Sequence, residues 1–200
     1  MPDIPQLREC EICILAGGLS QRMGRDKARL RFGKKRLLDH VLDAACATGY
    51  PVRVIRRDNV PRCGPLGGVF TGLTSARSDF VLFLACDMPM VGDELLHWLI
   101  EKSSRASAGL FVRFRRQIGF PFLLPRQIAP IVTNQIEQKD FSLHALARIL
   151  HSRILTVPRR FARELRNLNT PEDLVELTQL SPRRMGRPRF RSNRSPSTKM

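Results

Sequence analysis

The segment with the most chemical content follows a short apolar run near the start of the chain. It reads Leu15-Ala16-Gly17-Gly18 and continues to Arg22 and Lys27. Neither glycine has a Cβ, so the backbone amides can come close to a ligand. Arg22 and Lys27 add two positive charges five residues apart. Bare amides beside fixed positive charge suit a polyphosphate, so the segment is predicted to be a phosphate-binding loop.

This loop differs from the two best-known phosphate loops. It is not a P-loop, because Lys27 is followed by Ala28 and the glycine spacing differs. It is not the dinucleotide-binding loop either, because the pattern G-x-G-x-x-G is absent from this segment. Two glycines after a strand also occur in ordinary strand-to-helix turns. The additional Arg22, Met23-Gly24 and Asp26-Lys27 make the pattern much more specific.

Asp87 is the second candidate, because it follows the apolar run 80–86 and precedes Met88-Pro89. A carboxylate at the carboxyl end of a central parallel strand lies where open α/β sheets bind ligands. Mg²⁺ typically binds one or two carboxylates together with substrate phosphates. An Asp can instead cap a loop or helix, but beside a phosphate loop the Mg²⁺ role is favoured.

Two further segments have both a functional and a structural interpretation. The small residues after Gly64 would let a helix N-terminus approach a base or ribose, or they serve helix packing alone. In the segment 167–174, the Thr-Pro-Glu sequence is explained as a helix start. That leaves Asn167 and Asn169 as its site candidates.

Strand and helix signals alternate along the chain, which predicts an α/β fold with a largely parallel sheet. Strands are expected at 12–16, 52–55, 80–85, 110–114, 118–124 and 153–157. Helices are expected at 35–47, from Pro65 onward, and at 92–103, 125–138, 142–151 and from about 170.

Charge and composition divide the chain into a domain and a tail. The net charge is +16, and residues 181–200 hold six Arg and one Lys without an acid. These residues are too poor in apolar side chains to fold, so we expect one domain over 1–180 and a disordered basic tail over 181–200. Such a tail could bind nucleic acid weakly. Eight basic residues between 22 and 36 would attract anionic substrates to the loop.

The five cysteines and the hydropathy indicate a cytoplasmic protein. An odd number of cysteines fits a reducing compartment. Cys10-x-x-Cys13 has redox spacing, but without a second pair we expect buried thiols. No secretory signal and no run of roughly 18 apolar residues is visible, so we expect no membrane contact.

The four motifs together resemble those of the molybdenum cofactor guanylyltransferases. That family has L-A-G-G-x-x-x-R-M-G-x-D-K, G-P-L-x-G, C-D-x-P and N-x-N-T-P-E-[DE]-L segments, which this chain matches in order within residues 12–177. The resemblance implies a Rossmann-like three-layer nucleotidyltransferase fold. It also implies transfer of GMP from GTP to the terminal phosphate of molybdopterin, with release of pyrophosphate.

The resemblance also implies roles for individual residues. The Leu15–Gly18 backbone would hold the nucleotide, and Arg22, Lys27 and an Mg²⁺ ion on Asp87 would serve catalysis. Asp58 looks like the acid that contacts guanosine, although it could be a surface turn residue, and Gly64 would lie beside the nucleotide. Asn167 and Asn169 would lie near the pterin. Molybdoenzymes or their chaperones would be the partners.

The chain departs from the family at one place. Only one strand, 52–55, fits between the helix ending at Ala47 and Gly64, where family members usually have two strands and a helix. We therefore expect a missing edge βα unit, which could weaken guanine selectivity. Two alternatives stay open: transfer from CTP or another nucleotide, and a degenerate protein that binds nucleotide or cofactor without turnover.

Overall fold

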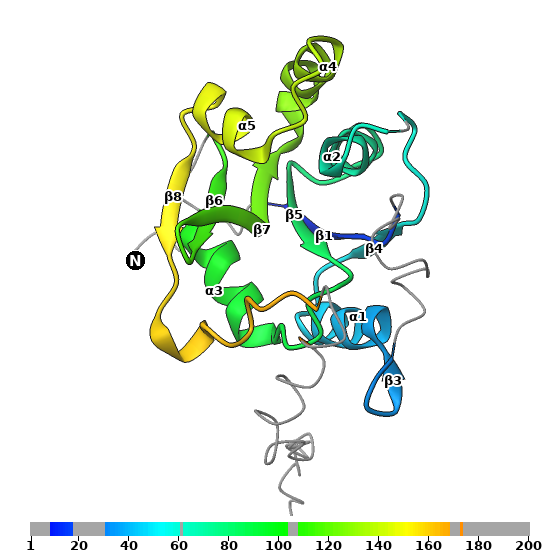
Figure 1. Ribbon diagram of the computed structural model, residues 1–200, viewed down its shortest axis with the longest axis vertical. Coiled ribbons are helices and arrows are strands. Elements are labelled where there is room, and N and C mark those ends of the chain that lie inside the picture. Colours follow the sequence, from blue (N-terminus) through cyan, green and yellow to red (C-terminus); the bar gives the residue numbers. More distant parts are fainter. Residues whose placement is uncertain (1–8, 18–30, 61, 104–107, 169–172, 174–200) are drawn as a thin grey trace, which may run out of the picture.

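The computed structural model describes residues 9–17, 31–60, 62–103, 108–168 and 173, and these form an α/β fold (Figure 1). The main sheet contains six strands in the order β4-β1-β5-β7-β6-β8. They are β1 (Cys10–Leu15), β4 (Val52–Ile55), β5 (Phe80–Ala85), β6 (Leu110–Phe114), β7 (Gln117–Pro125) and β8 (Arg153–Thr156).

The strand directions confirm a mostly parallel sheet. β1 pairs in parallel with both β4 and β5, and β6 pairs in parallel with β8. β7 is antiparallel to both of its neighbours, β5 and β6. All strands except β7 therefore end on the same side, which we call the carboxyl end of the sheet.

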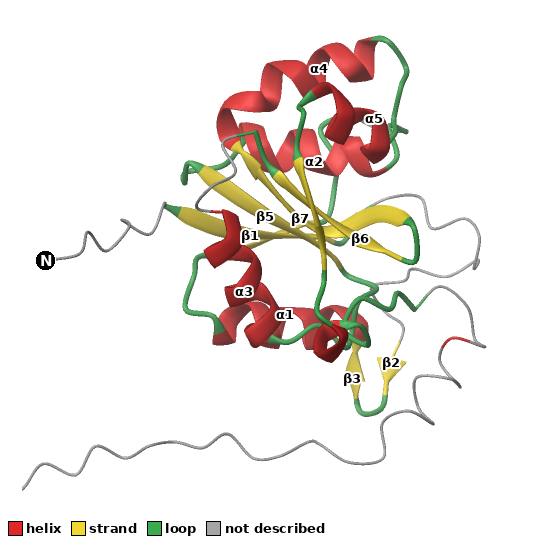
Figure 2. Ribbon diagram, turned by 90° about the vertical axis from the view of Figure 1, so that its left-hand side faces the viewer, coloured by secondary structure: helices red, strands yellow, loops and turns green. Residues whose placement is uncertain are grey.

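Helices cover both faces of the sheet, giving three layers (Figure 2). The helices α1 (Leu37–Ala47) and α3 (Asp93–Ser103) lie on one face, and α2 (Pro65–Thr74), α4 (Ala129–Glu137) and α5 (Leu143–Ile149) lie on the other. Successive strand side chains point to opposite faces. Ile12 and Ile14 accordingly pack with α1 and α3, whereas Cys13 packs with α2.

Several expected elements differ from the structure by one or two residues at an end, β1 among them, which starts at Cys10, and two helices differ because other elements take part of their range. The helix expected from 35 starts at Leu37, because residues before it form the hairpin β2 (Arg31–Phe32) and β3 (Lys35–Arg36). Gly33 has φ 62°, which allows the chain to reverse there. The helix expected at 125–138 is divided into a 3-10 turn at Arg126–Ile128 and α4. The expected last helix lies outside the described residues except for Asp173.

The expectation of a single strand between α1 and α2 is confirmed. β4 is the outermost strand on its side of the sheet. Besides β4, the described residues between α1 and α2, which are 48–60 and 62–64, contain no strand. The predicted tail at 181–200 lies outside the described residues.

The cysteines are all free, as expected for buried thiols, although Cys46 is exposed. Burial raises the pKa of Cys10 and of Cys13 to about 12. Both groups therefore stay protonated near neutral pH and are poor nucleophiles. Within the described part of the chain, no helix is long and apolar enough to cross a membrane.

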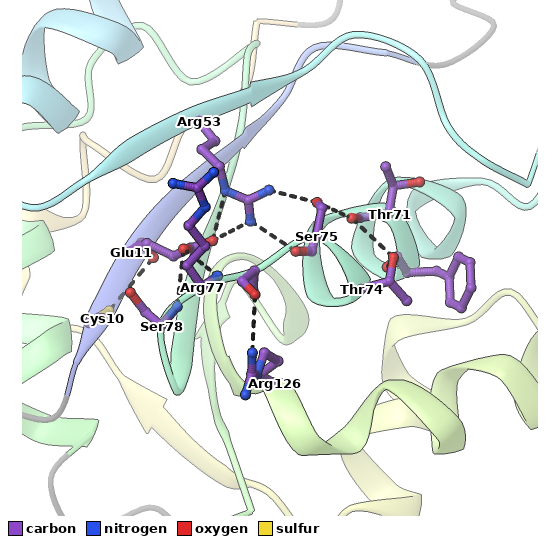
Figure 3. Close-up of polar contacts among 12 residues, drawn as sticks. Cys10, Glu11, Arg53, Thr71, Thr74, Ser75, Arg77, Ser78 and Arg126 are labelled. Atoms are coloured by element: carbon purple, nitrogen blue, oxygen red, sulfur yellow. Dashed lines mark hydrogen bonds and ion pairs between the residues drawn. The ribbon is translucent and has the colours of Figure 1, made fainter.

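A buried ion pair joins the strands at the opposite, amino end of the sheet (Figure 3). The Glu11 side chain is only 3% exposed, and its Oε1 accepts a hydrogen bond of 2.8 Å from Arg53 Nε. Glu11 Oε2 accepts from the backbone N–H groups of Arg77 and Ser78 at 3.0 and 3.3 Å. Arg53 also donates to the Gly72 carbonyl at 2.9 Å. The pair thus connects β1 and β4 with the end of α2.

Removing one partner of this pair should destabilise the fold. Arg53→Ala leaves the buried Glu11 carboxylate without its counter-ion, so we expect the free energy of unfolding to fall by about 3 kcal/mol. Urea denaturation measures this change. The matched control is Lys35→Ala, which breaks the exposed Lys35–Asp43 pair and should leave the melting temperature nearly unchanged. Equal effects of the two variants would contradict the structural role.

Candidate functional site

The site is built on three neighbouring strand ends. Leu15 of β1 is in register with Ile55 of β4 and with Ala85 of β5. Beyond these pairs, Ala16 N–H donates to the Ile55 carbonyl at 2.8 Å, and Cys86 N–H donates to the Leu15 carbonyl at 3.2 Å. The loops that follow β1, β4 and β5 therefore begin side by side, as expected for ligand sites in α/β sheets.

Asp58 lies between the first of these loops and the start of α2. A Cβ on Gly17 would be 2.9 Å from the Arg56 carbonyl oxygen and 3.3 Å from Asp58 Oδ1. A Cβ on Gly67 would be 3.2 Å from Asp58 Oδ2, and one on Gly68 would be 3.3 Å from Asp58 Oδ1. Because these three glycines have no side chain, there is room between them for the Asp58 carboxylate.

Two of the small residues after Gly64 have a packing role. Gly67 and Gly68 serve close packing, because a Cβ there would lie 2.6 Å from the Val60 carbonyl oxygen or 2.9 Å from Leu15 Cδ1. Asp58 is half-buried in the loop between β4 and α2. Burial raises the pKa of its carboxyl group.

Gly64 precedes α2 and has φ 54°, a conformation that glycine adopts without strain. Pro65 is in the first turn of the helix, where a missing N–H costs nothing. The next residues of α2 contact Asp58 and Leu15. The N-terminus of α2 is therefore at the carboxyl end of the sheet, as the candidate site requires.

Asp87 is two residues beyond β5 and is half-buried. Its backbone carbonyl accepts a hydrogen bond of 2.7 Å from Leu168 N–H. Nearby, Glu164 Oε2 accepts from Gly92 N–H at 2.8 Å. These two hydrogen bonds hold the segment 164–168 against the loop between β5 and α3. The exposed Asn167 is next to Asp87 for this reason, whereas Asn169 lies outside the described residues.

A small apolar cluster supports these segments. Leu37 and Leu168 are 0% and 2% exposed, and they pack with Phe32 and Met90. His40 Nε2 forms a hydrogen bond of 2.8 Å with the Phe32 carbonyl oxygen. We call these four apolar residues the Leu168 cluster. It joins the β2–β3 hairpin, the loop after Asp87 and the segment that carries Asn167.

The remaining predicted loop residues, Gly18, Arg22 and Lys27, lie in 18–30, outside the described residues. Sequence reasoning missed two exposed arginines, Arg56 and Arg57, which directly follow β4. The Arg56 carbonyl is in contact with Gly17. Basic residues directly after a predicted strand were the signal that could have identified them.

The donor set fits a metal ion that is shared with a substrate. In the ranges that the structure describes, no group of three His, Cys, Asp or Glu side chains could hold a metal. Mg²⁺ does not need such a group, since one carboxylate and substrate phosphates with waters complete its shell. Asp87 supplies a carboxylate just beyond β5, beside the end of β1, where the predicted phosphate loop begins.

An open groove of about 410 Å³ lies elsewhere, between α2 and α4. Its lining residues are Phe70, Thr74, Ala129, Pro130, Thr133, Asn134 and Glu137. None of them is a predicted site residue, so the groove does not mark the candidate site.

The raised pKa of Asp58 predicts a pH-dependent cost to stability. Burial disfavours the charged form of a carboxyl in the folded state. Below the ordinary pKa of about 4 the group is protonated and this penalty is absent, whereas above the raised pKa the group is charged and the folded state is less stable. Asp58→Asn should therefore raise the melting temperature at pH 7. The gap to the wild type should close as the pH falls to about 4. The exposed Asp79→Asn is the control, and a gap that is the same at both pH values would contradict this account.

The Leu168 cluster predicts local rather than global loosening. Leu168→Ala removes a buried side chain worth about 2 kcal/mol or more. We expect amide hydrogen exchange in 31–36 and 86–92 to become about tenfold faster, with β1 and β5 unchanged. Ile149→Ala, at a position 46% exposed, is the control and should change neither region. Uniform acceleration over the whole chain would refute a local role.

Comparisons with known proteins agree with this geometry. Residues 12–157 match the MobA-like NTP transferase domain family. The molybdenum cofactor guanylyltransferase of Pseudomonas putida KT2440 is 33% identical over 198 residues, which cover 88% of this chain and all of that protein.

Two solved structures share the fold. Molybdopterin-guanine dinucleotide biosynthesis protein A from Archaeoglobus fulgidus has a TM-score of 0.68 at 17% identity, covering 85% of this chain and 97% of that one. The 2-C-methyl-D-erythritol 4-phosphate cytidylyltransferase from Thermus thermophilus has a TM-score of 0.64 at 16% identity, covering 86% of this chain and 98% of that one. The family match over residues 12–157 and the relative that is 33% identical show that the chain belongs to the MobA-like NTP transferase domain family.

Proposed function

We propose that this protein transfers GMP from GTP to the terminal phosphate of molybdopterin, forming the guanine dinucleotide cofactor and pyrophosphate. The observation that carries the proposal is the meeting of Leu15–Gly17, Asp58 and Asp87 at one end of the sheet. The name of the Pseudomonas putida relative supports the same reaction.

The nucleotide would bind on the β1, β4 and α2 side of the site. The backbone of Leu15–Gly18 and the start of α2 near Gly64 would approach the ribose and phosphates. The Asp58 carboxylate accepts hydrogen bonds only, which suits the two N–H donors on the edge of guanine. Cytosine offers one amino group at its corresponding edge, so Asp58 would favour GTP over CTP.

The phosphates would be neutralised by Arg22 and Lys27. Placing two anionic groups in line for transfer requires positive charge that is already oriented before reaction. Asp87 would hold Mg²⁺, which when bound supplies Lewis-acid stabilisation of the phosphate oxygens. The terminal phosphate of the acceptor can attack the α-phosphorus directly, so the protein needs no nucleophile of its own.

The acceptor would bind on the other side of Asp87. Asn167 and Asn169 can donate and accept hydrogen bonds through their amides, as a pterin ring requires. The backbone hydrogen bond between Leu168 and Asp87 supports this role, because it ties the residue after Asn167 to the loop that carries Asp87. The dinucleotide product would pass to molybdoenzymes or their chaperones in the cytoplasm.

The site roles are tested by Lys27→Ala and Asp87→Ala. Each should lower the rate of GMP transfer by at least about 100-fold, because charge that is oriented toward the transition state is lost. Melting temperatures should stay within a few degrees of the wild type. The exposed Lys102→Ala and Asp43→Ala are matched controls and should retain the wild-type rate.

The assay measures labelled GMP transfer together with binding of GTP, CTP and ATP, with and without Mg²⁺. Near-normal transfer by either site variant would refute the assigned roles. Transfer from CTP in place of GTP would support the alternative substrate. Nucleotide binding without transfer by the wild type would support a protein that has lost turnover.

A further inference from the structure

The turn between β6 and β7 has an unusual sequence for its geometry. Phe114 pairs with Gln117, so Arg115 and Arg116 form a two-residue turn. Their φ angles are 46° and 68°, and positive φ at both positions is the mark of a type I′ turn. Asn-Gly and Asp-Gly are the preferred sequences there, since larger side chains are strained at positive φ. Two arginines therefore cost stability at this turn.

The turn is at the carboxyl end of the sheet, like the candidate site. β6 runs in the same direction as β5, because each is antiparallel to β7. The β5–β7 pairing reaches only Phe83 and Phe122, whereas β6 and β7 stay paired to Phe114 and Gln117. The hairpin thus extends beyond its last bridge to β5, and Figure 2 shows β6 and β7 side by side toward the turn.

More arginines lie beside this turn. Arg113 is in register with Thr156 of β8, so the hairpin tip is adjacent to the residues that follow β8. The exposed arginines at the tip of the hairpin and after β8 are Arg115, Arg116, Arg159, Arg160 and Arg163. We call this set the arginine surface. Among the described residues, none of them has a carboxylate oxygen within 4 Å.

Two of these guanidinium groups lie over aromatic rings. Arg115 Cζ is 5.4 Å from the centroid of Phe114, and Arg160 Cζ is 4.5 Å from the centroid of Phe161. Stacking restricts the side chain while leaving its N–H groups available. The nearby carboxylate of Glu164 is engaged by Gly92 N–H. Within the part of the chain that the structure describes, the arginine surface can therefore accept an anion without first breaking an ion pair.

The chain connects this surface directly to the candidate site. After β8 it passes Arg159, Arg160 and Arg163 and reaches Leu168, whose N–H binds the Asp87 carbonyl. Figure 1 shows this part of the chain running from β8 past α3 toward α1. In the sheet, β7 and β6 are on one side of β5, and β1 and β4 are on the other. The arginine surface is thus on the side of Asp87 opposite to Asp58.

We propose that the arginine surface binds the anionic acceptor, a pterin that carries phosphate, on the side of Asp87 opposite to the nucleotide. The inference rests on the proposed function and adds a subsite to it. Guanidinium groups bind phosphate in a bidentate manner and stack on flat rings, so they suit both parts of such an acceptor. The strain of the Arg115–Arg116 turn is retained for this binding.

The test is the double variant Arg115→Asn with Arg116→Gly, which keeps the turn and removes both charges. Because Asn-Gly favours a type I′ turn, the melting temperature should rise by about 2 to 4 °C. The KM for molybdopterin should rise about fivefold or more, and the KM for GTP should not change. Equilibrium dialysis of molybdopterin measures the same loss of affinity without turnover.

The matched control is Arg148→Gln with His151→Gly. It also removes a positive charge and relieves a positive φ, of 50° at His151, but His151 lies just before the start of β8 at the amino end of the sheet. Both KM values should stay at the wild-type level. A stabilised double variant with lower acceptor affinity would support the subsite.

Two results would overturn the proposed acceptor subsite. If the wild type transfers GMP and the double variant keeps the wild-type KM for molybdopterin, the subsite is wrong and the proposed function stands. If the wild type neither transfers GMP nor binds molybdopterin, the proposed function fails and the subsite fails with it.

Discussion

The register of β1 between two parallel strands is the constraint on which the site depends. Leu15 is in register with Ile55 on one side and with Ala85 on the other, so three loops start at the same level. A shift of one residue would turn every side chain of β1 to the opposite face and move the buried Ile12 and Ile14 out of their places in the core. The apolar core thereby fixes where the Asp58 and Asp87 loops begin.

The glycines of this family pattern serve packing as much as ligand access. Gly17, Gly67 and Gly68 leave room for the Asp58 carboxylate and for backbone contacts that a Cβ would block. Burial of that carboxylate opposes ionisation. The ionised Asp58 carboxylate therefore lowers the stability of the ligand-free protein, and it is a hydrogen-bond acceptor that a base with N–H donors could engage. Such a local cost is typical of binding sites.

Long apolar runs were predictable from the sequence, and contacts between distant residues were not. β5 was expected with its observed bounds, because a continuous apolar run defines a buried strand. The short β4, which contains Arg53, was also expected with its observed bounds. The β2–β3 hairpin was missed, since two-residue strands of mostly basic residues carry no periodic signal. The proximity of Asp87 to Leu15 followed from strand direction. The bond between Leu168 and Asp87 joins residues far apart in the sequence, and no local pattern predicts it.

The inward charge of Arg53 has a consequence for self-association. β4 leaves one row of backbone donors and acceptors unpaired by any described strand, which invites a second chain to add a strand there. β4 is only four residues long, and Arg53 within it is committed to Glu11. A strand added along this edge would have to place one of its own side chains beside this charged pair, on the same face of the sheet, and an apolar side chain is disfavoured there. The ion pair that holds the sheet together therefore also makes this edge a poorer partner for a second copy.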